Sequence, residues 1–171
     1  MMPKVEWRKV LRYLLFLFLG LILQTMLLSR TRIVGVCPYV LPAAAVAVGM
    51  FEGPVAGVLY GLLLGCFADM AFVENTVLFT VLFPGLAFAT GFVSQFFINR
   101  RFFAFMGAAA LGLLITAFAQ VLHTSAMDSF SVVMVRTAIL QTLWSLPLAA
   151  LAYVFPSRWS EFTPISKGEK T

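Results

Sequence analysis

The sequence has little charge for its length. Asp, Glu, Lys and Arg make up 11% of its 171 residues, whereas a typical soluble domain has about 25%. Hydrophobic residues make up 61%, and the mean hydropathy is +0.98. A chain this apolar does not have enough polar surface to cover a core in water. The composition therefore excludes an ordinary soluble domain and predicts an integral membrane protein.

Residues that carry catalytic or metal chemistry are also scarce. The single histidine, His123, cannot form a site of paired histidines. The two cysteines, Cys37 and Cys66, lie inside apolar runs without the spacing of metal ligands. The sequence has no Gly-x-Ser-x-Gly elbow, no glycine-rich phosphate loop and no spaced pair of acids to hold magnesium. We therefore expect no enzyme activity, no metal and no cofactor.

Long apolar runs dominate what remains. A transmembrane helix needs about 20 apolar residues, and short polar or Gly-Pro breaks separate runs of this length. We predict an all-α membrane protein, a bundle of about six transmembrane helices, with His123 to Ser131 as a polar loop. Pro38 and Pro42 predict an irregular start to the second span. The predicted spans are 11–28, 33–51, 54–72, 77–98, 102–122 and 132–155, and 156–171 is expected to be a flexible cytoplasmic tail.

Basic residues gather on one side of the predicted membrane. The first apolar run continues to Leu28 without a cleavage site, so we interpret it as a retained span. With the N-terminus inside, only Arg30, Arg32 and Arg136 fall on the outer side. The inner side receives Lys4, Arg8, Lys9, Arg12, Arg100, Arg101, Arg158, Lys167 and Lys170. This bias predicts that both termini are cytoplasmic.

Glycines recur at every fourth position in the third predicted span. The row is Gly53, Gly57, Gly61 and Gly65. A glycine inside a helix costs about 1 kcal/mol relative to alanine, and in lipid such small residues allow helix backbones to approach closely. The row predicts either packing within the same bundle or docking of another protein. A similar row of small residues on the fifth span includes Gly112.

Polar residues near the outer ends of the spans form the second set of candidates. Asp69 is the one acid well inside an apolar run, so it is either a functional group or an interfacial acid that is paired with a base or caps a helix. We expect an ion pair with Arg136, because both residues fall near the outer boundary of the hydrocarbon. Gln120 and His123 lie on the same side. Together these residues predict either a small-ligand vestibule or side chains that snorkel to the interface.

The segment from Glu52 to Asp69 resembles the central segment of the rod shape-determining protein MreD family. It matches the pattern G-P-x-x-G-x-x-x-G-x-x-x-G-x-x-x-D, and the resemblance is most specific between Pro42 and Gly91. It implies a non-enzymatic scaffold of the bacterial cell-elongation complex in the plasma membrane. Such a subunit binds MreC and links to the MreB filament and RodA-type peptidoglycan synthases. The implied fold is similar to the S-components of energy-coupling-factor transporters.

That fold similarity supplies the alternative interpretation, a substrate-binding subunit of a vitamin transporter. S-components carry an Ala-x-x-x-Ala coupling face in the first span. The first predicted span, 11–28, contains no alanine. This difference favours the scaffold over the transporter.

Overall fold

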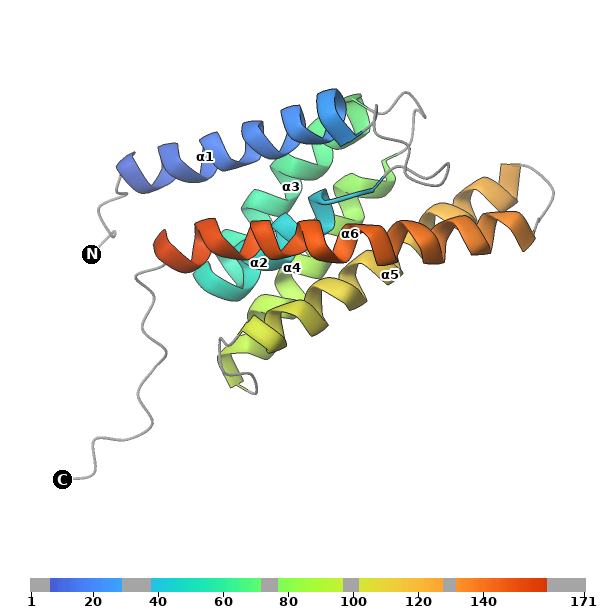
Figure 1. Cartoon of the computed structure of the whole chain (residues 1–171). Coiled ribbons are helices and arrows are strands. Elements are labelled where there is room, and N and C mark those ends of the chain that lie inside the picture. The colour runs from blue at the N-terminus through green and yellow to red at the C-terminus, as the bar shows by residue number, and fades with distance from the viewer. Residues whose placement is uncertain (1–6, 29–37, 72–76, 97–101, 128–131, 160–171) are drawn as a thin grey trace.

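The computed structural model consists of helices that run back and forth through one bundle. It describes residues 7–28, 38–71, 77–96, 102–127 and 132–159, and no strand occurs among them. The helices are α1 (Trp7–Ile22) with the π-helical turn η1 (Leu23–Leu28), α2 (Leu41–Glu52), α3 (Pro54–Ala71), α4 (Leu78–Phe96), α5 (Phe102–Met127) and α6 (Val132–Trp159). The start of α1 and the end of α6 lie at the same end of the bundle (Figure 1). We call this the terminal end, and the opposite end the far end.

Four helices, α3 to α6, are long and apolar enough to cross a membrane. The described part of the chain is therefore helical and has the long apolar helices of a membrane protein. The apolar stretch of α1 and η1, Val10–Met26, and helix α2 are shorter. At 12 residues, α2 is about 18 Å long, well short of a hydrocarbon core of about 30 Å.

Helix α2 is the centre of the fold. Every residue from Leu41 to Phe51 is buried, and α2 packs against α3, α4, α5 and α6. The irregular start predicted from Pro38 and Pro42 is confirmed, because 38–40 are not helical and Pro42 lies in the first turn of α2. A proline is tolerated there because the missing N–H would have no helical partner. The regular helix begins at Leu41, and the predicted start of the span at 33 lies outside the described residues.

Helix α5 extends farther at the far end than the sequence predicted. His123 to Met127 continue α5 and are not part of a loop. The polar side chains return their hydrogen bonds to the helix itself: Thr124 donates to the carbonyl of Gln120 at 2.9 Å, and Ser125 donates to that of Leu122 at 2.9 Å. Such bonds satisfy hydroxyl groups without interrupting the helix. At the terminal end α6 continues to Trp159, and 160–171 lie outside the described residues.

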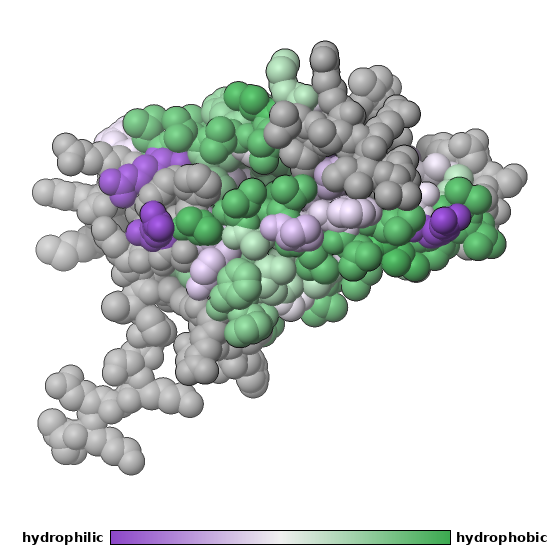
Figure 2. All heavy atoms as spheres, viewed as in Figure 1, coloured by the Kyte–Doolittle hydropathy of each residue, from purple (hydrophilic) through white to green (hydrophobic). Residues whose placement is uncertain are grey.

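The bundle presents apolar side chains on its exterior. Figure 2 shows hydrophobic residues over the flanks of the helices, with strongly hydrophilic residues near the two ends of the bundle. On α3, Met70 is 80% and Val55 75% exposed, whereas its buried residues include Gly57, Gly61 and Gly65. This arrangement, with small residues inside and large apolar residues outside, is expected for helices that pack in lipid.

Candidate functional site

The glycine row of α3 packs against α4 of the same chain. A Cβ atom added to Gly61 would lie 2.8 Å from the carbonyl oxygen of Phe83. One added to Gly65 would lie 2.7 Å from the Cα of Thr80 and would also clash with the Phe79 carbonyl. Real Cβ atoms do not approach backbone this closely, so α3 and α4 are in backbone contact. Of the two interpretations of this row, the geometry favours packing within the bundle.

Two further glycines, Gly49 and Gly91, extend this contact to α2, and neither was predicted from the sequence. A Cβ atom on Gly57 would lie 2.6 Å from the Cα of Gly49, and one on Gly91 would lie 2.7 Å from the backbone nitrogen of Pro54. Gly49 and Gly91 stand singly in apolar runs, and a lone glycine in such a run was the only sequence signal. The backbones of α2, α3 and α4 therefore meet in one tightly packed core.

Gly53 and Gly112 differ in role, although both were predicted to pack helices. Gly53 ends α2 with a φ of 93° and donates its N–H to the carbonyl of Gly49 at 3.0 Å. Its nearest contact for an added Cβ is Gln95 Nε2 at 3.4 Å, so glycine is required there by the backbone turn and not by packing. Gly112 on α5 does pack: an added Cβ would lie 3.0 Å from Val46 Cγ2 of α2.

The predicted ion pair between Asp69 and Arg136 is wrong. The Asp69 carboxylate of α3 accepts hydrogen bonds from the N–H of Phe79 at 3.1 Å, and from the N–H and hydroxyl of Thr80 at 2.8 Å and 2.6 Å. These N–H groups belong to the first turn of α4, where helix N–H groups have no helical acceptor. A carboxylate also interacts favourably with the positive end of the helix dipole. Asp69 therefore caps α4 from the end of α3.

Arg136 and His123 lie on the α5–α6 hairpin, away from this cap. Arg136 is exposed on α6 and His123 is half-buried on α5. Among the described residues no ion pair joins Arg136 to Asp69. Topology alone placed the two groups at a similar depth, but it did not fix which helices are neighbours. α3 packs chiefly on α4 and α2, whereas α6 packs chiefly on α5 and α2.

A cluster of polar groups secures the non-helical backbone before α2. The Gln24 side chain, 3% exposed, donates to the carbonyl of Pro38 at 3.0 Å and accepts from the N–H of Val40 at 3.0 Å. The N–H of Tyr39 donates to the hydroxyl of Ser145 on α6 at 2.7 Å. Non-helical backbone at membrane depth is tolerated only where it is satisfied within the protein. This role of Gln24 and Ser145 was not predicted from the sequence.

Gln120, one of the predicted site residues, lies beside this cluster. Together with Gln141 and Thr142 it lines a small polar gap between α5, α6 and Tyr39. The gap has essentially no volume for even a water molecule. The Thr142 hydroxyl donates to the Ala138 carbonyl at 3.0 Å. The gap beside Gln120 therefore leaves no space for a ligand, and Asp69, Arg136 and His123 do not line it.

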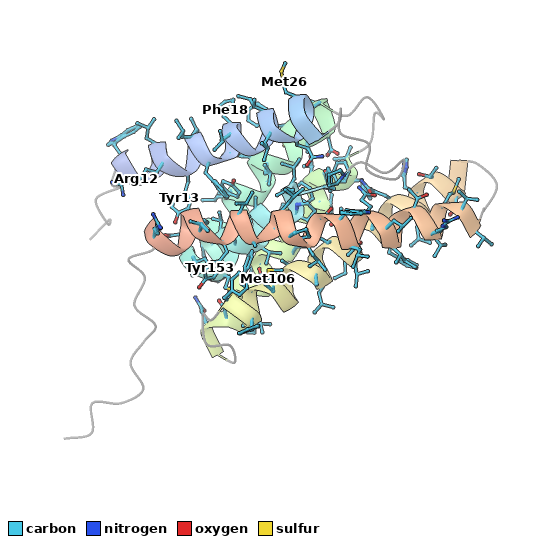
Figure 3. All side chains as sticks on the ribbon, in the orientation of Figure 1. Arg12, Tyr13, Phe18, Met26, Met106 and Tyr153 are labelled. Carbon is cyan, nitrogen blue, oxygen red and sulfur yellow. The ribbon has the colours of Figure 1, made fainter. Side chains whose placement is uncertain are left out.

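At the terminal end, α1 is attached to the bundle by aromatic and polar contacts. Tyr13 extends from α1 toward the other helices, whereas Met26 points to the opposite side (Figure 3). The ring of Phe18 lies against Phe67 of α3, with ring centroids 5.8 Å apart. The Tyr13 hydroxyl donates to the Glu52 carboxylate at 2.6 Å. The ring of Tyr60 lies edge-on to Tyr13, with ring centroids 6.5 Å apart. These contacts position α1 against the junction of α2 and α3.

In the part of the chain that the structure describes, no group of three or more His, Cys, Asp or Glu side chains could hold a metal ion. The structure instead shows backbone contacts among α2, α3 and α4, and the cap that Asp69 forms on α4. It also shows the hydrogen bonds from Gln24 to the backbone before α2, which we call the Gln24 clamp. Comparison with protein-family profiles, with curated proteins and with solved structures finds no match to this chain.

Proposed function

We propose that this protein is a non-enzymatic scaffold subunit of a bacterial cell-elongation complex, as in the MreD family that its sequence resembles. In this role it binds the membrane-anchored protein MreC and connects it to the MreB filament and to RodA-type wall synthases. It resides in the plasma membrane with the terminal end facing the cytoplasm. The basic residues concentrated at the chain ends and between α4 and α5 support that orientation.

The observation that carries the proposal is the way the family-like pattern is used in the fold. Pro54 begins α3, Gly57, Gly61 and Gly65 pack its backbone on α4 and α2, and Asp69 caps α4. Every fixed position of the pattern from Pro54 to Asp69 therefore helps to join α3 and α4 into one rigid unit. Residues that hold the helices rigidly together suit a subunit that keeps its partners in place.

The same geometry directs partner contacts to other faces. Because the glycine row is covered by α4, a partner reaches the bundle at its exposed surfaces. Helix α1 offers such a surface, since Leu11, Leu15 and Ile22 are 65%, 63% and 56% exposed. We expect changes on this face to weaken MreC binding without unfolding the bundle, and changes in the glycine row to do the reverse.

Depletion of the protein in its host tests the cellular role. The proposal expects wider or rounded cells, and rescue by a tagged copy that also co-purifies MreC. Leu15→Ser is expected to reduce this co-purification while preserving abundance, and Val55→Ser on the exposed face of α3 is the matched control. Normal cell shape combined with a vitamin requirement would contradict the scaffold role and favour a transporter subunit.

A further inference from the structure

Helices α4 and α5 diverge to leave an apolar groove of about 380 Å³ between them. Leu86 and Val93 belong to the α4 wall, Gly107 and Leu111 to the α5 wall, and Met50 of the buried helix α2 also lines it. The lining reaches Ser94 on α4 and Ala104 on α5, close to the ends of these helices at Phe96 and Phe102. The groove therefore opens along the half of the bundle nearer the terminal end.

The side chains that line the groove offer no free hydrogen-bond donor to an occupant. Its two hydroxyl side chains are already engaged with backbone carbonyls. Thr90 donates to Leu86 at 2.8 Å, and Ser94 to Gly91 at 3.0 Å and to Met50 at 3.2 Å. An occupant that carries polar groups would leave them unpaired, which is unfavourable in an apolar site. The lining therefore selects for plain hydrocarbon.

The shape of the groove favours a single hydrocarbon chain over a helix. At Gly112 an added Cβ atom would lie 3.0 Å from Val46 and 3.8 Å from Leu86 of the opposite wall, so the walls converge there. A helix with side chains is about 10–12 Å wide and does not enter such a narrow base. At Gly107, by contrast, an added Cβ atom would meet nothing within 4 Å. This open space beside a narrow base fits a slim, flexible chain.

Basic residues at the same end of the bundle indicate which kind of lipid carries the hydrocarbon chain. The sequence between α4 and α5 contains Arg100 and Arg101, which lie outside the described residues. Basic residues at a membrane surface attract anionic headgroups. We propose that the α4–α5 groove binds one acyl chain of an anionic phospholipid from the leaflet at the terminal end. This inference does not depend on the scaffold role.

Native mass spectrometry of the intact protein, purified in mild detergent and titrated with phosphatidylglycerol, tests the site. Wild type is expected to retain one phosphatidylglycerol. Gly107→Phe, which fills the groove, is expected to lower retention at least fivefold. Gly85→Phe is the matched control, because Gly85 is also exposed with nothing within 4 Å of an added Cβ but does not line the groove. Leu111→Trp is a second filling variant, used if Gly107→Phe unfolds.

A second measurement tests the preference for an anionic headgroup. Replacing both arginines, Arg100→Gln with Arg101→Gln, is expected to lower the preference for phosphatidylglycerol over phosphatidylcholine by roughly fivefold per charge. Equal retention by the folded filling variants and the control would overturn the site, as would wild type without bound lipid. Filling variants that keep the lipid but lose a co-purifying helix would also overturn it, and would assign the groove to a partner.

Discussion

The carboxylate of Asp69 accepts two hydrogen bonds from Thr80, one from its N–H at 2.8 Å and one from its hydroxyl at 2.6 Å. The end of α3 is thereby fixed to the first turn of α4. Gly65 packs on the backbone of this same first turn, and Gly61 packs on the Phe83 backbone farther along α4. The α3–α4 pair is therefore secured both by a polar cap and by backbone packing, and each contribution can be removed separately.

Removing the cap is expected to destabilise the protein moderately. Asp69→Ala leaves the N–H groups of Phe79 and Thr80 without their acceptor, and loss of a helix cap costs about 0.5–2 kcal/mol. Asp69→Asn keeps one acceptor oxygen and is expected to cost less. Thermal unfolding in detergent measures both. Arg136→Ala is the control: it should be neutral, and coupling between Asp69→Ala and Arg136→Ala would show that the cap is not the main role of Asp69.

Filling the glycine row is expected to separate α3 from α4. Gly61→Ala forces a Cβ atom toward the Phe83 carbonyl, where only 2.8 Å is available, and overpacking of this kind costs about 1–3 kcal/mol. Gly61→Leu should cost more and lower the abundance of inserted protein. Gly85→Ala on α4 is the matched control, since an added Cβ there meets nothing within 4 Å. If Gly61→Leu kept full stability but lost a partner, the row would be a docking surface.

The clamp before α2 provides a third test. Gln24→Leu leaves the Pro38 carbonyl and the Val40 N–H unpaired in the interior, and each buried unpaired group costs about 1–3 kcal/mol. We expect a large fall in the unfolding temperature in detergent, and a smaller one for Ser145→Ala, which removes the acceptor of the Tyr39 N–H. Thr25→Val, which removes a partly exposed hydroxyl bonded to its own helix, should be close to neutral. Equal effects of all three changes would contradict the clamp.

The proposed orientation is tested by labelling single cysteines in a background without Cys37 and Cys66. Cysteines placed at Lys4, Asn99 and Lys167 should react with a membrane-impermeant reagent only after the cells are opened. Cysteines at Asn75 and Ser129 should react in intact cells. Reaction at Asn99 in intact cells would reverse the assignment of the cytoplasmic side.

Most of the helices could be predicted from the sequence, because their cause is local. An apolar run in lipid must satisfy its own backbone, and a helix is the simplest way to do so. The break at Gly53–Pro54 is also local, since Gly53 adopts a positive φ and Pro54 is suited to a first turn. The shortness of α2 was not predictable from apolarity, because that helix is shielded on all sides by others and is not bounded by the membrane.

The candidate site was likewise predictable from the sequence only in part. The sequence by itself determined that Gly57, Gly61 and Gly65 share a helix face and that Asp69 needs a partner, since both follow from helix geometry and the cost of a charge in lipid. Only the tertiary structure decided that the face meets α4 and that the partner of Asp69 is the first turn of that helix. Many residues lie at the same depth in a membrane, so depth alone does not identify the partner of Asp69. The close approach of the α2, α3 and α4 backbones places the first turn of α4 beside it.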